Sequence, residues 1–597
     1  MTPRTLHRGS RAFSPSGLRA VCVAHDEAGT RHLETWELTE AGPRRRLRIT
    51  LDRDLPLTQC VALDDGRALL SWHEPGGVQR IDLFDRTGGR RPLGPCPTPL
   101  RLLPGLDLPG WIATAIAYGA DEHSTVFRVG DDGPWLTPVT RLPGRLGGTA
   151  AVGVCLAVTA VVDGTPTPLR IDPTAPESGR VTRLTPDGDG TGARHVLSSR
   201  AGRVLLAMDT DTGLRLAVAT GDDVRLLDGP STPDSTVTPL ALDPTGCLLA
   251  AAVNRGARSE LAVYDVESGA VRQVATPPGV VGPEAAWTRR GLWLAYSGPT
   301  RPTVFGWVPP GESELRSAPA QAGRHPARLE RLPGAEGSVE AVVHGPDWRG
   351  GSPVVIALHG GPDRHWTLGF DTLLQFFADA GLAVIAPNQR GSTGYGRGHA
   401  DAIRGAWGGP DLADIRALRA YVDETRGPGA PRPAVYGSSY GAFLALLATA
   451  ADPEGWSGCV AVAPFSSVSA LHADANPPTR HLIDRLAGHG DVDDALGSRD
   501  LLRLVERIRT RVFLLHGRLD ETIPVSHSRA LAHRLIDAGH GDVTYREPAD
   551  RGHTAFSPLA GAPQPREITD FLARPDVLRR ASAGQGHRPL LAAAAHH

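Results

Sequence analysis

A unit of about 45 residues recurs along the first half of this chain. In each copy a polar turn ends in glycine and an apolar run of strand character follows, as in Asp64-Asp65-Gly66 before residues 67–70. The marker glycines stand at 17, 66, 110, 202, 246 and 291, mostly 44 to 49 residues apart. The interval of 92 residues between 110 and 202 equals two units, and a degenerate copy near Gly153 fills it. Seven strand-only units at this period predict a seven-bladed β-propeller with one four-stranded blade per unit.

The alternative for the first half is a β-sandwich whose glycine spacing is coincidental. So long a run of near-equal intervals favours the propeller, which we place at residues 1–320. No blade carries a recognisable metal or phosphate motif. Residues 309–327 are polar, rich in Pro and Gly and without periodicity, so we interpret them as the connection to a second domain.

From residue 338 the pattern changes to alternating strands and helices. Residues 353–358 form a continuous apolar run, which is typical of a strand buried on both faces. Residues 372–381 and 413–424 have helical character, and further buried strands are expected at 459–463 and 512–516. This pattern predicts a doubly wound α/β domain over 321–580, with its site at the carboxyl ends of parallel strands. Residues 581–597 are expected to form a flexible tail.

Composition excludes several classes of function. A length of 597 residues exceeds what one core supports, and a net charge of -2 gives no electrostatic case for nucleic acid or an anionic membrane. The N-terminus lacks an apolar signal-peptide core, and no stretch approaches the roughly 20 apolar residues of a membrane span. The six cysteines are dispersed, without a C-x-x-C pair. We therefore expect a cytoplasmic protein with no metal and no cofactor.

The chemistry centres on residues 437–441, which read G-x-S-x-G. A short apolar run precedes this motif, and residues 442–448 form an apolar run of good helix formers after it. Strand, sharp turn and buried helix are the context of a nucleophile elbow, the turn that exposes a catalytic hydroxyl. The residues two before and two after the nucleophile must be small, because strand and helix pass close together there. Gly437 and Gly441 meet this requirement for Ser439, and not for Ser438.

A serine hydroxyl needs an imidazole to accept its proton, and the imidazole needs a carboxylate to orient it. In α/β-hydrolases these residues follow the order Ser, Asp or Glu, His, with the last two on loops after strands. Asp520 lies just past the predicted strand at 512–516, with Glu521 as its rival, and His553 lies on the loop after the last predicted strand. We predict the triad Ser439, Asp520 and His553. Four other histidines near Asp520 are interpreted as structural or solvated: His516, His527, His533 and His540.

Acyl transfer also needs backbone N–H groups that stabilise the developing oxyanion. The residue after the nucleophile, Tyr440, is expected to supply one. The loop His359-Gly360-Gly361-Pro362, which follows an early strand, is expected to supply the other, because its glycines permit close approach to a substrate carbonyl. The alternative for this loop is a plain turn.

Several motifs in the second half together resemble the prolyl oligopeptidase family, and most closely its acylaminoacyl-peptidase and dipeptidyl-peptidase-like branch. The resemblance implies a serine peptidase for short peptides, with a seven-bladed propeller that caps the active site. It also implies that Gly361 and Tyr440 donate the oxyanion N–H groups. By analogy of position, Phe465 and Ile523 line the pocket for the residue before the scissile bond. The motifs, in chain order, are His359-Gly360-Gly361-Pro362, residues 388–396, Trp407-Gly408-Gly409 with Asp411 and Asp414, the elbow, His516-Gly517 with Asp520 and Pro524, and Gly552-His553.

Two positions depart from that family pattern. The elbow ends in Gly441-Ala442, where relatives usually carry two glycines, and Thr522 stands where relatives often carry Arg or Asn to hold the substrate backbone. The expected substrates are short peptides or small acyl-amides. These departures leave open an amidase, esterase or acyl-transferring cyclase that acts on a small metabolite. A non-enzymatic propeller that binds partners is the third alternative, and the sequence leaves a homo-oligomer open.

Overall fold

The protein is described here as a computed structural model. The model describes residues 5–51, 57–74, 77–96, 98–131, 133–162, 164–177, 180–185, 194–210, 213–221, 223–227, 235–488, 490, 492, 494–554, 556 and 564–574. The chain divides into two compact units, of which the first ends at Ala320 and the second begins at Gln321. The hairpin tip Arg255–Arg258 is grouped with the second unit. The expected tail at 581–597 lies outside the described residues.

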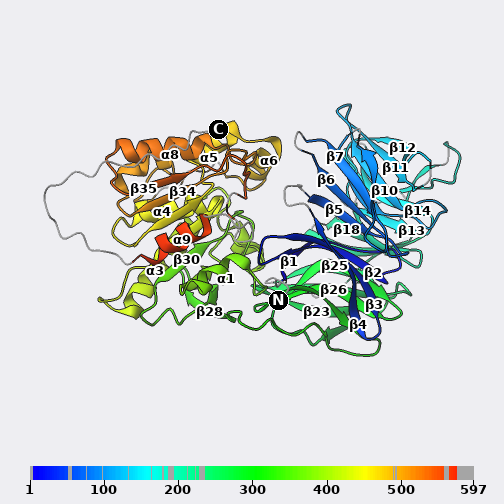
Figure 1. Cartoon of the computed structure of the whole chain (residues 1–597), viewed down its shortest axis with the longest axis horizontal. Helices are drawn as coiled ribbons and strands as arrows, with labels where there is room; N and C mark the ends of the chain where they lie inside the picture. The colour runs from blue at the N-terminus through cyan, green and yellow to red at the C-terminus, as the bar shows by residue number, and fades with distance from the viewer. Residues whose placement is uncertain are drawn as a thin grey trace. The chain divides into compact units, whose positions relative to one another are not determined.

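The first unit is a seven-bladed β-propeller, as the repeat predicts (Figure 1). The described strands form six antiparallel sheets of four strands and one sheet of three. The blades are β1–β4 (Thr5–Phe13, Arg19–Asp26, Arg31–Thr39, Gly42–Leu51), β5–β8 (Leu57–Ala62, Ala68–His73, Gln79–Phe84, Arg90–Pro95), β9–β12 (Leu100–Pro104, Ala113–Tyr118, His123–Val129, Leu136–Pro143), β13–β16 (Thr149–Val152, Cys155–Val162, Thr165–Ile171, Val181–Arg183), β17–β20 (Arg194–Arg200, Arg203–Thr210, Gly213–Thr220, Asp223–Leu226), β21–β24 (Thr236–Leu242, Leu248–Arg255, Arg258–Asp265, Val271–Val274) and β25–β27 (Val280–Thr288, Gly291–Gly298, Arg301–Val308).

The marker glycines occupy the same turn in every blade, where the first strand passes to the second. All seven have φ between +60° and +123°, the left-handed region that residues with a side chain rarely adopt. The recurring glycine is therefore a requirement of this turn. The seven are Gly17, Gly66, Gly110, Gly153, Gly202, Gly246 and Gly291.

The last blade differs from the prediction of four strands per unit, because its described sheet contains three. Pro309 and Pro310 follow β27 and lack backbone N–H donors, so they cannot continue a sheet ladder. Further along, Trp307 and Arg316 exchange backbone hydrogen bonds of 2.9 and 2.8 Å as an isolated bridge. Residues 309–327, which we interpreted as the connection between domains, thus touch the edge strand β27 of the last blade at Arg316.

Aromatic packing between the first and last blades closes the ring. The ring of Phe305 lies 5.5 Å from Phe13 and 5.6 Å from Trp36, in edge-to-face arrangements. Arg11 forms an ion pair with Glu284 across the same seam. Strand β1 contacts both β25 and β27, so the two ends of the repeat meet without an exchanged strand.

The second unit is an α/β domain around one eight-stranded sheet, ordered β28-β29-β31-β30-β32-β33-β34-β35. The first two strands pair antiparallel, and the six from β31 to β35 in this order run parallel. The strands are β28 (Ala327–Pro333), β29 (Ser338–His344), β30 (Val354–Leu358), β31 (Ala383–Pro387), β32 (Ala434–Ser438), β33 (Cys459–Val462), β34 (Val512–Leu515) and β35 (Val543–Arg546).

Helices cover both faces of this sheet because alternate side chains of its strands point to opposite faces. One core contains residues of α3, α4, α7 and α8, and the other contains residues of α1 and α9. In β30, Ile356 belongs to the first core and Val355 to the second. The helices are α1 (Thr372–Asp379), α2 (Arg397–Asp401), α3 (Pro410–Arg426), α4 (Tyr440–Ala451), α5 (Val468–Asp474), α6 (Pro477–Arg485), α7 (Leu501–Leu504), α8 (Ser526–Asp537) and α9 (Gln564–Ala573).

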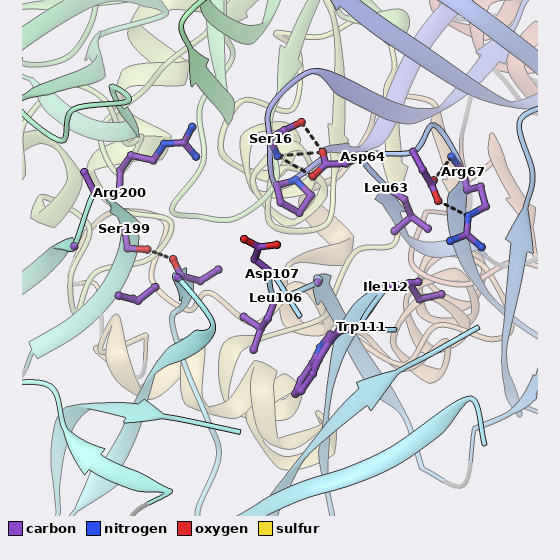
Figure 2. Close-up of a pocket in the computed structure, with 18 residues that line it drawn as sticks. Ser16, Leu63, Asp64, Arg67, Leu106, Asp107, Trp111, Ile112, Ser199 and Arg200 are labelled. Carbon is purple, nitrogen blue, oxygen red and sulfur yellow. Dashed lines mark hydrogen bonds and ion pairs between the residues drawn. The ribbon is translucent and has the colours of Figure 1, made fainter. Parts of the chain in front are cut away.

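The propeller contains a cavity of about 650 Å³, lined by the glycine turns of its first five blades (Figure 2). Its polar groups include Ser16, which is hydrogen-bonded to Asp64, and Arg67, which pairs with Asp65 and Asp131. None of its described lining residues is a histidine, so they provide no imidazole to activate a serine. The candidate chemistry lies in the second unit.

Candidate active site

Ser439 lies on the sharp turn between β32 and α4. Its φ is +57°, an uncommon conformation for a residue with a side chain, and its backbone N–H donates to the carbonyl of Val462 at 2.8 Å. At the start of α4, the backbone N–H groups of Ala442 and Phe443 donate to the carbonyl of Ser439. The turn therefore fixes this residue from both sides, as a nucleophile elbow requires.

The two glycines of the motif are required by close backbone packing. A Cβ atom on Gly437 would lie 2.0 Å from the carbonyl oxygen of Gly441. A Cβ atom on Gly441 would lie 2.5 Å from the carbonyl oxygens of Leu358 and His359. Real Cβ atoms do not approach backbone this closely, so the elbow admits no side chain at either position.

The three predicted triad residues form one hydrogen-bonded chain. His553 Nδ1 lies 2.8 Å from Asp520 Oδ2, and His553 Nε2 lies 3.1 Å from Ser439 Oγ. A carboxylate only accepts hydrogen bonds, so Nδ1 carries the proton. In the neutral ring Nε2 then accepts the Ser439 hydroxyl hydrogen, which is the arrangement that a general base requires.

Asp520 is buried and fully hydrogen-bonded. Its side chain has an exposed fraction of 0 %, and its Oδ1 atom accepts the backbone N–H groups of Thr522 and Ile523 at 2.8 and 2.9 Å. Burial alone would raise the pKa of this carboxyl, but hydrogen bonds from His516, His553 and the Ile523 amide outweigh burial and hold the pKa well below its ordinary value. Asp520 is therefore ionised wherever the imidazole works as a base. The rival Glu521 is exposed.

Sequence reasoning missed His516 as part of this group. His516 Nε2 lies 3.1 Å from Asp520 Oδ2, so two imidazoles share one carboxylate oxygen. The available signal was the spacing of four residues between His516 and Asp520 across a turn that contains Gly517. The other three histidines set aside do not contact the triad among the described residues: His527 bonds Ser466, His540 bonds Thr510 and His533 is exposed.

The predicted oxyanion donors belong to the start of α4 and to the loop after β30. Tyr440 is the first residue of α4, and the N–H groups of a helix's first turn have no intrahelical partner. Gly361 lies in the loop after β30 with φ +128°, and a Cβ atom on its neighbour Gly360 would lie 3.4 Å from Ser439 Cβ. His359 is buried in the same loop, where it contacts Ser392 Oγ at 2.8 Å and burial lowers its pKa to about 4. A neutral His359 thus supports this loop as a fixed element.

The side chain of Tyr440 makes a second contact that the motifs did not reveal. Its hydroxyl donates to Asp411 Oδ2 at 2.5 Å, and the ring packs edge-on against Trp407. Asp411 lies in the first turn of α3 and is fully buried. The residue that follows the nucleophile is therefore anchored through its side chain.

The two predicted pocket residues are both packed into the core, with exposed fractions of 2 %. Phe465 stacks on Phe443 with ring centroids 4.4 Å apart. The backbone N–H of Ile523 donates to Asp520 of the predicted triad, and its carbonyl accepts from the adjacent His516. Their role in a substrate pocket stays a prediction.

Other kinds of site find no support in the described part of the chain. There, no group of three or more His, Cys, Asp or Glu side chains is arranged to hold a metal ion. No helix among the described residues is long and apolar enough to cross a bilayer. The cysteines are unpaired thiols, five of them buried and Cys247 partly exposed.

Residues 368–575 match the prolyl oligopeptidase family, so this segment is a domain of that family. The rat acylamino-acid-releasing enzyme is 24 % identical over 312 residues, which cover 47 % of this chain and 42 % of that enzyme. The dipeptidyl peptidase family member 6 of Caenorhabditis elegans is 27 % identical over 229 residues, which cover 37 % of this chain and 30 % of that protein. The chain thus aligns with less than half the length of these relatives.

Two solved structures share the architecture of nearly the whole chain. The Pyrococcus horikoshii acylaminoacyl peptidase superposes with a TM-score of 0.73 and 15 % identity, over 95 % of both chains. A puromycin hydrolase superposes with a TM-score of 0.72 and 19 % identity, over 96 % of this chain and 95 % of that one. At these identities the likeness establishes the fold, a seven-bladed propeller followed by an α/β-hydrolase domain.

Proposed function

We propose that this chain, whose residues 368–575 are a prolyl oligopeptidase family domain, is a serine hydrolase that cleaves amide bonds of short peptides. The observation that carries the proposal is the hydrogen-bonded chain from Ser439 through His553 to Asp520. His553 lies within hydrogen-bond reach of both Ser439 and Asp520, which is the geometric requirement for nucleophilic catalysis by serine.

Acylation begins when Ser439 Oγ attacks the substrate carbonyl carbon while His553 Nε2 accepts the hydroxyl proton. The carbonyl oxygen becomes an oxyanion, which the backbone N–H groups of Gly361 and Tyr440 stabilise. Asp520 stabilises the imidazolium that forms and holds its ring in place. His553 then donates the proton to the amine leaving group as the carbon–nitrogen bond breaks.

Deacylation repeats these steps with water as the nucleophile. His553 accepts a proton from the water, which attacks the acyl-enzyme carbonyl. The second oxyanion collapses, the ester bond to Ser439 breaks, and His553 returns the proton to the serine oxygen. The products are a carboxylic acid and the amine released earlier, so no other reactant is required.

The substrate class is supported by the similar proteins, which include an acylamino-acid-releasing enzyme and a member of the dipeptidyl peptidase family. We propose that the propeller restricts entry to small substrates, and that Phe465 and Ile523 border the pocket for the residue before the scissile bond. The proposal includes a cytoplasmic location and no nucleic-acid or membrane partner, in keeping with the net charge of -2.

A small-metabolite amidase or esterase is the second candidate. Thr522 stands where family members often carry Arg or Asn, and its backbone N–H is already bonded to Asp520. The short side chain cannot reach a substrate backbone as a guanidinium does. A puromycin hydrolase is among the proteins with the same fold.

A panel of chromogenic substrates tests both candidates. Wild-type protein and Ser439→Ala would be assayed on acyl-amino-acid, aminoacyl, prolyl and simple ester chromogens. If the wild-type protein cleaves peptide amides and Ser439→Ala does not, the proposal is supported. Residual turnover in Ser439→Ala above a few per cent of wild type refutes Ser439 as the nucleophile. A preference for simple esters alone favours the second candidate. Failure of Ser439 to react with a fluorophosphonate probe would favour a non-enzymatic binding protein.

A further inference from the structure

The carboxylate of Asp520 has four hydrogen-bond donors, which is its full capacity. Two are the backbone N–H groups of Thr522 and Ile523 on Oδ1, and two are the imidazoles of His516 and His553 on Oδ2. His553 is needed to explain the proposed chemistry, and the two amides are a product of the local turn. Neither the proposed chemistry nor the local turn explains the fourth donor, His516.

The contacts of His516 define its tautomer. Its Nε2 atom faces two acceptors, Asp520 Oδ2 at 3.1 Å and the Ile523 carbonyl at 2.9 Å, so Nε2 carries a hydrogen that both share. Its Nδ1 atom lies 2.7 Å from Ser528 Oγ on α8, a hydroxyl that donates to a neutral ring. His516, Ser528 and the Asp520 side chain have exposed fractions of 0 %. These bonds are therefore shielded from bulk solvent.

The loops of the acid and the base are also tied together beside His516. The backbone N–H of Arg518 donates to the carbonyl of Pro548 at 2.9 Å, and that of Leu519 donates to the carbonyl of Arg551 at 2.8 Å. A Cβ atom on Gly517 would lie 2.3 Å from the carbonyl oxygen of Gly552. The backbone thus sets the distance between the loops and, through the amides of Thr522 and Ile523, holds Asp520 Oδ1, so Oδ2 is the atom left for the imidazoles to orient.

We propose that His516 is a positioning residue, which aims Asp520 Oδ2 at His553 and withdraws part of its charge. The inference rests on the proposed function of the triad. A carboxylate that loses the second imidazole donor would rotate more freely and would stabilise the His553 imidazolium more strongly. The freer rotation slows the chemical step because His553 is held less well, and the stronger stabilisation of its imidazolium moves the acid limb of the pH profile to higher pH.

Other titratable groups near His516 lie on separate elements. His553 contacts the same carboxylate from the loop after β35. His527 on α8 interacts electrostatically with His516, and Asp474 of α5 lies 3.8 Å from His527 Nε2. A His516 variant loses both the bond to Asp520 and the interaction with His527, but only Asp520 contacts His553 directly, so a change in the acid limb reports the lost bond to Asp520.

The test compares His516→Leu, which removes the donor, with His516→Gln, whose amide N–H reaches toward the same acceptors. We expect His516→Leu to lower kcat about 10- to 100-fold with KM nearly unchanged. The acid limb of its kcat/KM profile should move to higher pH by about half a unit. His516→Gln should recover most of both effects. A folded His516→Leu enzyme with a wild-type acid limb would overturn the proposal.

His344→Leu is the matched control, because His344 is a buried histidine of the same sheet and its ring nitrogens have no hydrogen-bond partner in the described structure. It should leave the pH profile unchanged. A measurement independent of turnover is the downfield proton of His553 Nδ1, assigned by its loss in His553→Ala. This signal should shift in His516→Leu and stay near its wild-type position in His516→Gln and His344→Leu. Where His516→Leu does not fold, His516→Asn, whose amide is one methylene shorter than that of Gln, takes its place. An unshifted signal in the folded variant that lacks the donor would overturn the proposal. Full activity of Ser439→Ala would instead refute the proposed function and leave this measurement standing.

Discussion

The hydroxyl of Tyr440 donates a hydrogen bond of 2.5 Å to the buried carboxylate of Asp411. Burial is the main influence on this carboxyl and raises its pKa to about 6, although Tyr440 and the N–H of Leu412 partly stabilise its charge. The contact therefore joins the residue after the nucleophile to a carboxyl that titrates slightly below neutral pH. Because the ordinary pKa is 3.8, the folded state favours the protonated carboxyl.

We predict that Asp411→Asn stabilises the protein more at pH 8 than at pH 4. Well below pH 3.8 the carboxyl is neutral in both folded and unfolded states, so it adds no pH-dependent cost. As the pH rises from 3.8 to about 6 only the unfolded state ionises, so up to about 3 kcal/mol of stability is lost, and the loss levels off above pH 6. The test is the difference in thermal midpoint between variant and wild type across pH 4 to 8. A difference that does not change with pH would contradict the raised pKa.

Asp520→Asn should lower kcat about 10⁴-fold while the protein stays folded. An amide cannot hold the His553 Nδ1 proton as a carboxylate does, so the ring loses the tautomer in which Nε2 accepts from Ser439. The neighbouring substitution Glu521→Gln is the control, because Glu521 is exposed. We expect Glu521→Gln to stay within about twofold of wild type. Equal losses in both variants would show that Asp520 is not the orienting acid.

Gly437→Ala should disrupt the elbow. Its methyl group would lie 2.0 Å from the Gly441 carbonyl oxygen, a backbone atom that cannot move without shifting α4. We expect a loss of about 3 kcal/mol or more, together with loss of fluorophosphonate labelling at Ser439. Gly429→Ala is the matched control, because a Cβ atom there meets no atom within 4 Å and the residue is not in the left-handed region. A labelled, stable Gly437→Ala protein would refute the steric argument.

Phe305→Ala should weaken the closure of the propeller. Phe305 is buried between Phe13 and Trp36 of the first blade, so truncation leaves a cavity at the seam that joins the two ends of the ring. The expected loss is about 3 to 5 kcal/mol, measured as a lower thermal midpoint. Val161→Ala, at a propeller side chain that is 47 % exposed, should change stability by less than about 0.5 kcal/mol. Similar midpoints for the two variants would mean that the seam contributes little.

Short-range patterns in the sequence were sufficient to predict much of the architecture. The turn between the first two strands of a blade needs a left-handed residue, so seven glycines mark seven blades. The elbow needs two residues without side chains around Ser439, and the motif shows both. The order of Ser439, Asp520 and His553 is also a property of the chain, because each follows a strand of the parallel sheet.

Local pattern was insufficient where the outcome depends on contacts between distant segments. The last blade has three strands in the described structure, because only one residue pair, Trp307 and Arg316, aligns along its edge. Phe465 and Ile523 are packed into the core, a fact that their family positions did not reveal. The partner of Tyr440 is Asp411, 29 residues earlier, and no spacing rule connects them.

The sequence by itself determined the number of repeats, the strand and helix alternation, and the three residue types of the triad, because each depends on the geometry of a short stretch. Only the tertiary structure decided that Asp520 and not Glu521 contacts His553, and that His516 contacts the same oxygen. Ser439 and His553 are 114 residues apart, and their hydrogen bond exists because the parallel register of β32 to β35 brings the loops to one edge of the sheet. The direction of the side chains at that edge is set by packing and burial, which depend on contacts between several segments of the chain.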